Sequence, residues 1–414
     1  MSNLKIAELS WKKYIYYYDD LKDLDEKKAK MHYILHGKKE GRLVYQFNFD
    51  YFKGNGKPNN GILFSCNDYP GFGGAATNCY QIIKEFQRNN LKCCGLFFNN
   101  LDNLNNPYQK ESILYSNIIS NFSENIATGL RNKIINILGG EPKYVICKTY
   151  KSILICRLFF PKSYFIYLIS GITHFHLLPQ LKNISFQDFL KKEIHLGTIG
   201  LEKDALKHTN LIIFNSDITK QAFFKIYPNV DIKYQISDTS LIEGKKDILP
   251  KIYDIVICCS DLKRIDKNNQ FVLEILQKNF TNYRKIIIGK NYQDYQDIPN
   301  STFTDLISHT ECKHYISQSK ILIYPSLFDS NPNTVREALS YQCLPLISNN
   351  VGYYNYYPEY LVCKNYNRKT WITKIKYLLD NYQQLKEVKI KFPETESLLD
   401  IITEKMMVYT LDSK

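Results

Sequence analysis

Apolar residues recur along most of the chain as short continuous runs separated by longer amphipathic stretches. From Gly61 the runs are GILFSC, CCGLFF, KYVIC, YFIYLI and NLIIFN. A polar stretch at 238–251, DTSLIEGKKDILPK, interrupts this pattern, which then restarts with YDIVICC, RKIIIG, KILIYP, LPLIS and YLVC. Continuous apolar runs are typical of strands that are buried on both faces, as in a parallel sheet between two layers of helices.

The stretches between these runs have the spacing of amphipathic helices. Examples are ATNCYQIIKEFQRN, NQFVLEILQKN, NTVREALSY and TWITKIKYLLDNYQQL. Strands alternating with helices, in two successive series, predict an α/β protein with two Rossmann-like doubly wound domains. Open parallel sheets bind ligands at the carboxyl ends of their strands, so we expect the two domains to face a cleft that holds the site.

The pattern divides the chain into four parts. Residues 1–52 are predicted to form a small basic helical unit, LDEKKAKMHYILHGKKEGRLV at its centre, which we interpret as a solvated appendage without chemistry of its own. The turn-rich linker KGNGKPNNG opens the N-terminal domain, 53–245. The C-terminal domain is 246–390, and 391–414 should form a helix that packs back on the N-terminal domain.

Composition and charge narrow the class of protein. The 414 residues exceed one ordinary core, and 44% hydrophobic with 23% charged residues is typical of a folded soluble protein. A formal net charge of +13 favours anionic partners such as phosphates, nucleic acid or an acidic membrane surface. Abundant Asn, Lys, Ile and Tyr could equally reflect an AT-rich genome, of a microbe or a large DNA virus.

The eleven cysteines lie mostly inside apolar runs and form no C-x-x-C pair, which favours buried free thiols in a reducing compartment over zinc or disulfides. We therefore expect a cytoplasmic protein, in the host cytoplasm or the virion if it is viral. The first residues lack the apolar core of a signal peptide, and no apolar run approaches the ~20 residues of a membrane span. Peripheral membrane contact is left open.

Two glycine-rich or basic turns follow the first strand of each series. NDYPGFGGAATN (67–78) places Gly73 and Gly74 at a helix start, where backbone can approach an anionic ligand. A nicotinamide enzyme is disfavoured because the second strand ends in FFNN, without the acid that holds a ribose. The alternative is a plain strand–helix turn.

In CCSDLKRIDKNNQ (258–270), Arg264 and Lys267 precede a helix expected to start near Asn268 or Asn269. Two cations at that position suit a pyrophosphate. The alternative is a pair of solvated side chains.

The stretch PSLFDSNPNTVREALSYQCLPLIS carries two acids around a helix start. Asp329 lies in the loop after ILIYP, and Glu337 lies one to two turns into the helix, which should be capped by Asn331 or Asn333. Carboxylates so placed could hold two sets of ligand hydroxyls, with the helix amides between them facing phosphate.

Together these residues resemble a known family. The strand, the basic pair and PSLFDSNPNTVREAL are similar to the nucleotide-sugar domain of GT-B retaining glycosyltransferases, of the large family 4 that includes sucrose synthases and mannosyl phosphoinositide synthases. The likeness spans roughly residues 61–390. The N-terminal unit likewise resembles small H-Y-x-x-x-G-x-x-E-G-R units found beside domains in some carbohydrate-related proteins. Two departures are Asp329, where the family usually has Glu, and Gln342, where it usually has Gly.

The resemblance assigns roles to individual residues. Glu337 would hold the ribose, Asp329 the hydroxyls of the donor sugar, and Arg264 with Lys267 the diphosphate. In FIYLISGITHFH, His174 is preferred over His176 as the histidine that faces the sugar, and a structural histidine is the alternative. The other residues expected beside the donor are Gly73, Gly74, Gly289, Ser330, Asn331, Asn333 and Thr334. Asn215 and Ser216 are expected to shape a turn.

The function implied is transfer of a sugar, with retention, from a nucleotide-diphosphate sugar to the hydroxyl of a glycan, lipid or protein. No metal or other cofactor is expected, because no D-x-D stretch occurs in the cleft segments. Three alternatives stay open: an epimerase or phosphorylase of similar architecture, a nucleotide-sugar-binding protein without turnover, and a basic nucleic-acid binder. The last lacks any aromatic-basic recognition motif, so no specific nucleic acid is expected as a partner.

Overall fold

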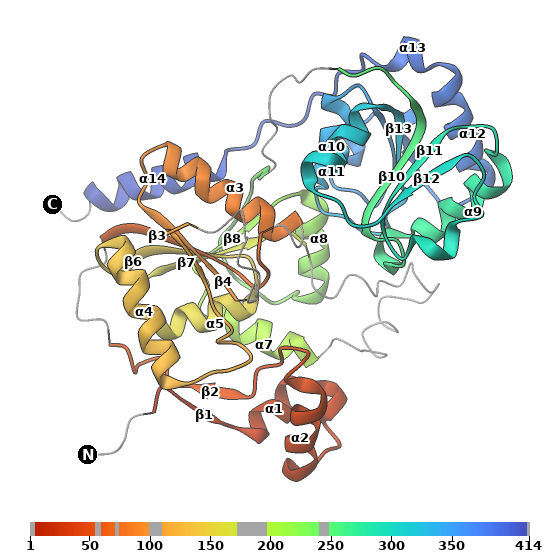
Figure 1. Ribbon diagram of the computed structural model, residues 1–414. Coiled ribbons are helices and arrows are strands. Elements are labelled where there is room, and N and C mark those ends of the chain that lie inside the picture. The colour runs from red at the N-terminus through yellow and green to blue at the C-terminus, as the bar shows by residue number, and fades with distance from the viewer. Residues whose placement is uncertain are drawn as a thin grey trace.

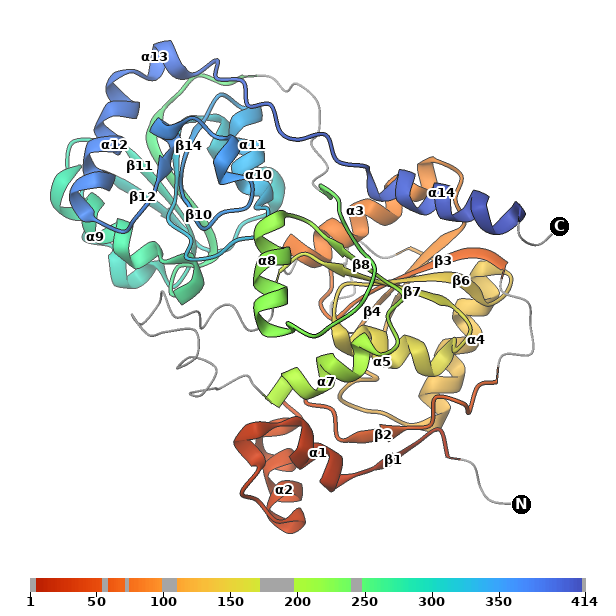
Figure 2. The same ribbon diagram turned by 180° about the vertical axis from the view of Figure 1, so that it is seen from behind.

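A computed structural model describes residues 5–53, 59–70, 74–98, 110–171, 197–239 and 248–411. Figure 1 shows two α/β lobes, with a small N-terminal unit attached to the first lobe on the side away from the second. Figure 2 shows the same arrangement from behind, including the segment that returns from the second lobe to the first. The predicted fold class, two doubly wound domains with an N-terminal appendage, is confirmed.

The N-terminal lobe is built on seven parallel strands in the order β5-β4-β3-β6-β7-β8-β9. Helices cover both faces of this sheet. The strands are β3 (Asn59–Cys66), β4 (Cys93–Phe97), β5 (Ile113–Tyr115), β6 (Pro142–Cys147), β7 (Tyr164–Ile169), β8 (Leu211–Phe214) and β9 (Tyr234–Ile236). The helices are α3 (Gly74–Arg88), α4 (Glu124–Leu138), α5 (Tyr150–Phe159), α7 (Gly197–Leu206) and α8 (Asp217–Ile226).

The C-terminal lobe repeats this plan with six parallel strands in the order β12-β11-β10-β13-β14-β15. The strands are β10 (Tyr253–Asp261), β11 (Lys285–Lys290), β12 (Ser301–Thr304), β13 (Ser319–Tyr324), β14 (Leu344–Ser348) and β15 (Val362–Cys363). The helices are α9 (Asn269–Asn279), α10 (His309–Ser317), α11 (Asn333–Ser340), α12 (Arg368–Asp380) and α13 (Tyr382–Leu385). Four short turns of 3-10 helix are η5 (Ile265–Lys267), η6 (Tyr292–Tyr295), η7 (Tyr354–Tyr356) and η8 (Glu359–Leu361).

The N-terminal unit contains two short strands as well as helices. Its β1 and β2 pair antiparallel and carry the helices between them. The elements are β1 (Ala7–Leu9), α1 (Trp11–Tyr17), η1 (Asp19–Leu21), α2 (Glu26–His32), the π-helical turn η2 (Tyr33–Gly37) and β2 (Tyr45–Phe47). The unit is joined to the first lobe by a hydrogen bond from Tyr17 Oη to Asp204 Oδ2 on α7 (2.9 Å).

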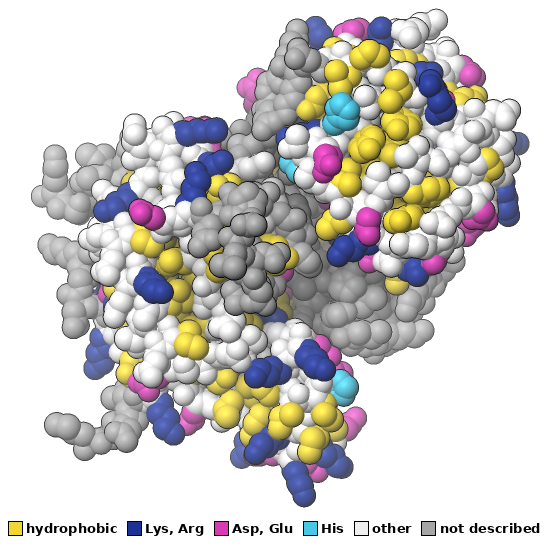
Figure 3. Space-filling model, viewed as in Figure 1, with side chains coloured by type: hydrophobic (Ala, Val, Ile, Leu, Met, Phe, Trp, Pro, Cys, Tyr) yellow, Lys and Arg dark blue, Asp and Glu magenta, His cyan; other side chains and the backbone are white. Residues whose placement is uncertain are grey.

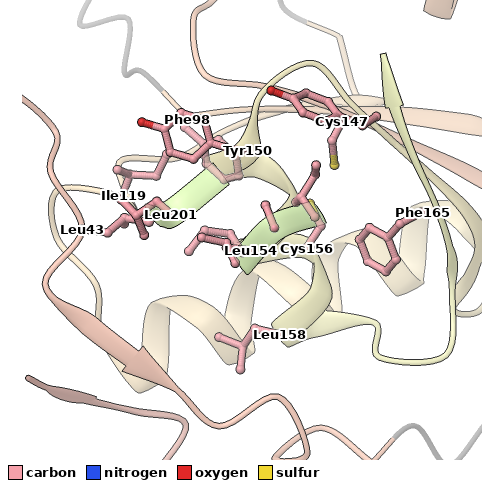
Figure 4. Packing of buried hydrophobic residues seen from close by; sticks show 14 of the residues in the cluster. Leu43, Phe98, Ile119, Cys147, Tyr150, Leu154, Cys156, Leu158, Phe165 and Leu201 are labelled. Carbon is pink, nitrogen blue, oxygen red and sulfur yellow. The ribbon is translucent and has the colours of Figure 1, made fainter. Parts of the chain in front are cut away.

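The most apolar stretch of the chain, around SILICRLFF, forms α5 and is buried. Thr149 starts this helix by accepting a hydrogen bond from the Ser152 amide at 3.3 Å. Figure 4 shows Leu154 and Leu158 of α5 among side chains from the sheet, from α7 and from the N-terminal unit, including Leu43. The unit therefore covers a helix face that would otherwise expose apolar surface to water.

The C-terminal helix α14 (Leu398–Leu411) returns to the first lobe. Leu398, Ile401 and Ile402 belong to the same buried cluster as the strand residues Ile62 and Phe64. In Figures 1 and 2 this helix lies beside α3, on the sheet face opposite α4 and α5. Within the described residues, no helix combines the length and the apolar character that crossing a membrane requires.

All eleven cysteines lie in the described ranges and are free thiols. Eight of them are buried, and the other three, Cys258, Cys259 and Cys312, are partly buried in the second lobe. Burial raises the pKa of the Cys66 thiol to about 11, which keeps the thiol protonated at neutral pH. These thiols act as small apolar side chains in the core.

Candidate active site

The two lobes touch where strands of both sheets end. Ser170 follows β7, Asn215 follows β8, and the loop after β13 carries Ser330. The Ser330 hydroxyl donates to the Ser170 carbonyl, and Asn215 Nδ2 donates to Ser330 Oγ at 3.0 Å. Because parallel strands all end at the same edge, this contact brings the carboxyl ends of the two sheets together. Two of the expected site residues, Asp329 and Asn331, flank Ser330 in the chain.

Asp329, Lys267 and Tyr324 form a hydrogen-bonded cluster in the second lobe. Tyr324 Oη donates to Asp329 Oδ2 at 2.6 Å, and Lys267 Nζ donates both to Tyr324 Oη at 3.0 Å and to Asp329 Oδ2. Burial, followed by the charge of Asp329, raises the pKa of Tyr324 well above its usual range, so the phenol stays a donor. Two residues 62 positions apart in the chain, Lys267 and Asp329, thus meet at one point.

The backbone around Asp329 is fixed by a neighbouring loop. Its amide donates to the Asn350 carbonyl at 3.0 Å, and its carbonyl accepts from the Gly352 amide at 2.7 Å. A β-carbon at Gly352 would lie 1.6 Å from the Ser330 carbonyl oxygen, so only glycine fits there. Gly352 is not among the predicted site residues, although its place between a strand and a Tyr-rich turn is a signal for close backbone approach.

Arg264 lies on the same loop as Lys267 but is already paired. Its Nε and Nη2 donate to Asp266 at 3.0 and 2.5 Å, and its side chain is 45% exposed. Burial lowers the pKa of Arg264, but the hydrogen bond and charge of Asp266 outweigh that effect and raise it. The following helix, α9, starts at Asn269, with Asn268 in the left-handed conformation just before it (φ +53°). The cation pair is therefore present at the helix start, with one acid attached to each cation.

Glu337 faces α10. Its Oε1 lies 2.8 Å from His309 Nε2 and 3.9 Å from Lys313 Nζ. A capping box of Ser308 and Glu311 starts α10 and so fixes the position of His309. Neither His309 nor Lys313 was predicted as a site residue; the Ser308-x-x-Glu311 signature was readable, but its proximity to Glu337 was not.

Helix α11 starts differently from the prediction. The residue before it is Pro332, which has no side-chain cap, so the expectation of Asn331 or Asn333 as the cap is wrong. Asn333 and Thr334 are instead the first two residues of the helix, where amides have no partner within the helix. Their backbone amides remain candidates for holding an anion.

Asn331 and Arg336 connect this helix to the segment that leaves the first lobe. Asn331 Nδ2 donates to Asp238 Oδ1 and Arg336 Nη2 to Asp238 Oδ2, both at 2.8 Å. The Arg336 guanidinium also lies 3.3 Å from the centre of the Phe392 ring, on the segment that returns to α14. We call Asp238, Asn331, Arg336 and Phe392 the interlobe latch. The buried Oδ1 of Asn331 has no hydrogen-bond partner among the described residues.

Two of the three glycines expected beside the donor, Gly74 and Gly289, lie within the described residues. Gly289 has φ +147°, and a β-carbon there would lie 2.1 Å from the Cys259 carbonyl oxygen, so close packing of β11 on β10 requires it. Gly74 is the first residue of α3. Gly73, His174 and His176 lie outside the described residues.

The first lobe contributes a polar group to the same edge. Buried Lys148, directly after β6, donates from Nζ to Asn78 Oδ1 at 2.8 Å, and Asn78 Nδ2 donates to the Thr239 carbonyl at 2.8 Å. Burial lowers the pKa of Lys148. No group of three or more His, Cys, Asp or Glu side chains with the spacing of a metal site occurs among the described residues.

Comparison with known proteins identifies the architecture. No known family model matches the sequence, and the search of curated proteins finds no match. The fold, however, matches solved glycosyltransferases. Sucrose-phosphate synthase from Thermosynechococcus elongatus superimposes with a TM-score of 0.57 and 11% identity, over 85% of this chain and 100% of that one.

Two further structures agree. HepE from Anabaena, solved with UDP and glucose, gives a TM-score of 0.58 and 12% identity over 86% of this chain and 100% of that one. TarM superimposes with a TM-score of 0.58 and 10% identity, over 84% of this chain and 98% of that one. The chain therefore has the GT-B glycosyltransferase fold, and the resemblance drawn from the sequence is confirmed at the level of this fold.

Proposed function

We propose that the protein is a glycosyltransferase that moves a sugar, with retention of configuration, from a nucleotide-diphosphate sugar to an acceptor hydroxyl. The observation that carries this proposal is the meeting of Lys267, Asp329 and the start of α11 at the carboxyl edge of the second sheet. A cation and free helix amides at one edge suit the diphosphate of a sugar nucleotide, and the carboxylate beside them suits the hydroxyls of its sugar. The neighbouring structure solved with UDP and glucose supports the same ligand class.

Each group has a distinct role in this scheme. Glu337, held by His309 and Lys313, accepts the ribose hydroxyls. Lys267 Nζ has three protons, so it can keep its bond to Asp329 and still donate to a phosphate oxygen. Asp329 accepts from a hydroxyl of the sugar. The Ser330 hydroxyl already bonds the other lobe, so this loop would contact the donor mainly through backbone amides.

The chemical step needs stabilisation of the leaving diphosphate while the sugar gains oxocarbenium character. The bond between the anomeric carbon and the phosphate oxygen breaks, and the electron pair stays on that oxygen beside Lys267, Arg264 and the α11 amides. The acceptor oxygen then bonds to the same face of the anomeric carbon and passes its proton to the leaving phosphate oxygen. No protein nucleophile takes part, and this charge compensation needs no metal.

The acceptor is a hydroxyl compound bound by the first lobe. Neighbours of the same fold include alpha-glucosyltransferases solved with UDP or UDP-glucose and DNA, a lipopolysaccharide outer core galactosyltransferase, and a glycosyltransferase involved in lipopolysaccharide biosynthesis. For this chain we propose a glycan, lipid or protein acceptor.

The test is a donor assay with purified protein. A panel of UDP-, GDP- and dTDP-sugars is incubated with the enzyme, with and without chelator, and free nucleotide, free sugar and isomerised donor are measured. We expect slow release of nucleotide and sugar from one donor class, unchanged by the chelator, with no isomerised donor. Glu337→Ala should weaken nucleotide binding about 10- to 100-fold through lost charge-assisted hydrogen bonds.

Glu359→Ala is the matched control, because Glu359 is a solvent-exposed carboxylate of the same lobe that forms a surface ion pair with Lys364. It should leave binding unchanged. Nucleotide binding that survives Glu337→Ala, with no turnover of any donor, contradicts the proposal. Isomerised donor without an acceptor would identify an epimerase instead.

A further inference from the structure

The outer face of the N-terminal unit exposes large apolar side chains. On α2 and η2, Met31, Ile34 and Leu35 are 55%, 57% and 52% exposed, whereas Ala29, Tyr33 and Gly37 face inwards and are buried. The inward side is tightly packed, since a β-carbon at Gly37 would lie 2.1 Å from Tyr14 Oη. This packing fixes the orientation of the helix, so that Met31, Ile34 and Leu35 stay exposed to solvent.

These three residues form one patch rather than scattered exposures. Positions three and four apart on a helix are neighbours, so Met31 lies next to both Ile34 and Leu35. Single exposed apolar residues need no explanation, but contiguous ones mark an interaction surface. The unit projects from the first lobe on the side away from the second lobe in both ribbon views, so the patch is remote from the candidate active site (Figures 1 and 2).

Lysines flank the patch on both sides. The segment 27–39, KKAKMHYILHGKK, contains five lysines and two histidines but no acidic residue. Lys27 and Lys30 precede the apolar residues by about one turn, and Lys38 and Lys39 follow them by about one turn. All five lysines are exposed, and among the described residues only Lys28 has a carboxylate partner, Asp25 at 3.6 Å. Figure 3 shows hydrophobic side chains on this unit with several Lys and Arg side chains around them, together with some Asp, Glu and His.

We propose that this face, defined as residues 27–39, docks on the surface of an anionic lipid bilayer. The lysines would contact lipid phosphates while Met31, Ile34 and Leu35 enter the boundary between headgroups and acyl chains. Lysine suits this arrangement because its aliphatic stem lies along the apolar layer while its ammonium reaches the phosphates.

Two observations favour a bilayer over a protein or nucleic acid. The apolar part is three side chains on the outside of a helix, whereas a stable protein interface covers about 800 Å² on each partner. A bilayer surface adapts to such a small, protruding patch. Duplex DNA offers a similar charge, but it would place phosphates against the apolar residues and gain nothing from their burial.

The inference is independent of the proposed transferase activity. It concerns a surface of the N-terminal unit, which is fastened to the first lobe through Tyr17 and through a hydrogen bond from Lys151 Nζ to the Gly41 carbonyl. Docking through this face would hold the first lobe close to the membrane and leave the second lobe free of it.

The test is flotation of the full-length protein with vesicles of phosphatidylcholine alone or mixed with phosphatidylglycerol, at low and high salt. We expect the wild type to bind the mixed vesicles at low salt and to be released as salt screens the charges. The triple variant Met31→Ser/Ile34→Ser/Leu35→Ser should bind at least about tenfold more weakly. The triple variant Lys27→Gln/Lys30→Gln/Lys38→Gln should lose on the order of 100-fold, about fivefold for each lysine.

Matched controls change the same residue types elsewhere. Ile248→Ser/Leu306→Ser removes exposed apolar side chains of the second lobe, and Lys278→Gln/Lys369→Gln/Lys376→Gln removes exposed lysines there. Circular dichroism and thermal unfolding check that every variant folds.

Three outcomes would overturn the proposal. The first is wild type that does not float with anionic vesicles at low salt. The second is a loss of binding in the control variants equal to that in the patch variants. The third is a dimer of the wild type in light scattering that becomes a monomer in Met31→Ser/Ile34→Ser/Leu35→Ser, while vesicle binding is unchanged. That result would make a second copy of the chain the occupant of the patch.

Discussion

Single residues of the second lobe hold positions that cost free energy. Gln342 lies two residues after the end of α11 in the left-handed conformation, with φ +56°. Lys285 is buried at the start of β11, and its Nζ donates to the carbonyls of Phe280 and Tyr283 at 2.8 and 2.6 Å. Each position gives a measurable effect on stability.

Replacing Gln342 with glycine should stabilise the protein. A residue with a β-carbon loses about 1 kcal/mol or more in the left-handed region, and part of this is returned because glycine gains freedom when unfolded. We expect Gln342→Gly to raise the free energy of unfolding by about 0.5 to 1 kcal/mol in urea titrations. Gln342→Ala removes the same hydrogen bond to Glu387 but keeps the strain, so it should not stabilise. Equal stability of the two variants would contradict this account.

Lys285 predicts a dependence of stability on pH. Burial lowers the pKa of Lys285 to about 8, with a smaller opposing effect from Asp254, while the unfolded chain keeps the ordinary value near 10.5. Between these two values the unfolded state binds more protons, so the contribution of Lys285 to stability rises with pH. Below about pH 8 both states are protonated, and the cost of the buried charge is fully present.

The check compares wild type with Lys285→Met. The difference in free energy of unfolding should move in favour of the wild type between about pH 7 and pH 9.5. Lys278→Met, at an exposed lysine of α9, should show no such change with pH. Parallel stability curves for wild type and Lys285→Met would refute the assignment.

At the level of elements, the loop between β13 and α11 is held by the loop after β14. The backbone of Asp329 pairs with Asn350 and Gly352, so the position of its carboxylate depends on that second loop. The side chain of aspartate is shorter than that of glutamate, and here it extends from a backbone that these hydrogen bonds hold in place. The backbone therefore cannot shift easily to bring the carboxylate closer to a ligand.

Gly352→Ala should displace this loop. A β-carbon there meets the Ser330 carbonyl oxygen at 1.6 Å, and backbone must move to relieve the overlap. We expect loss of several kcal/mol of stability or, if the loop yields instead, nucleotide binding weaker by on the order of tenfold or more. Gly129→Ala in the middle of α4 meets nothing within 4 Å and should stabilise by about 0.5 to 1 kcal/mol. Unchanged stability and binding in Gly352→Ala would show that the loop is not constrained.

The sequence predicts the central elements well because their signal is local. YFIYLI and LPLIS coincide with β7 and β14, since a buried parallel strand is apolar throughout. The short strands β5, β9 and β12 were missed. Two of them, β5 and β9, close the edges of the first sheet and β12 closes one edge of the second, where a strand needs fewer apolar residues.

The candidate site was predictable only in part, for a related reason. Asp329 and Glu337 are recognisable from a helix start with acids at a fixed spacing. Their partners are not, because His309 and Lys267 come from elements 28 and 62 residues away. Only the fold decides which distant charges meet, so the role of Asp238, which pairs with Arg336, could not be read from the chain.

At the scale of the whole molecule, the interlobe latch joins three segments. Asp238 leaves the first lobe, Asn331 and Arg336 belong to the second, and Phe392 lies on the returning segment. Asp238 is also fixed by its own amide, which donates to Thr395 Oγ1 at 3.0 Å. The interlobe latch thus binds both segments that connect the lobes, one carrying Asp238 and the other Phe392, to helix α11 and the loop before it.

Asp238→Asn should loosen this connection. The variant removes the charge that Arg336, only 5% exposed, depends on, and a hydrogen bond between charged groups contributes about 1.5 to 3 kcal/mol. We expect a larger radius of gyration in small-angle scattering and faster hydrogen exchange in residues 237–239 and 392–396. Asp297→Asn, at an exposed position of the second lobe, should change neither quantity. A scattering curve identical to that of the wild type would show that other contacts hold the lobes.

The contact of Ser330 with Ser170 and Asn215 has a thermodynamic consequence. One loop serves both the candidate donor site and the contact between the lobes, so nucleotide binding and lobe separation are linked equilibria. By reciprocity, if a nucleotide makes the closed arrangement more stable by some factor, then holding the lobes apart lowers nucleotide affinity by that same factor. Lobe orientation would then report on occupancy of the donor site even in the absence of an acceptor.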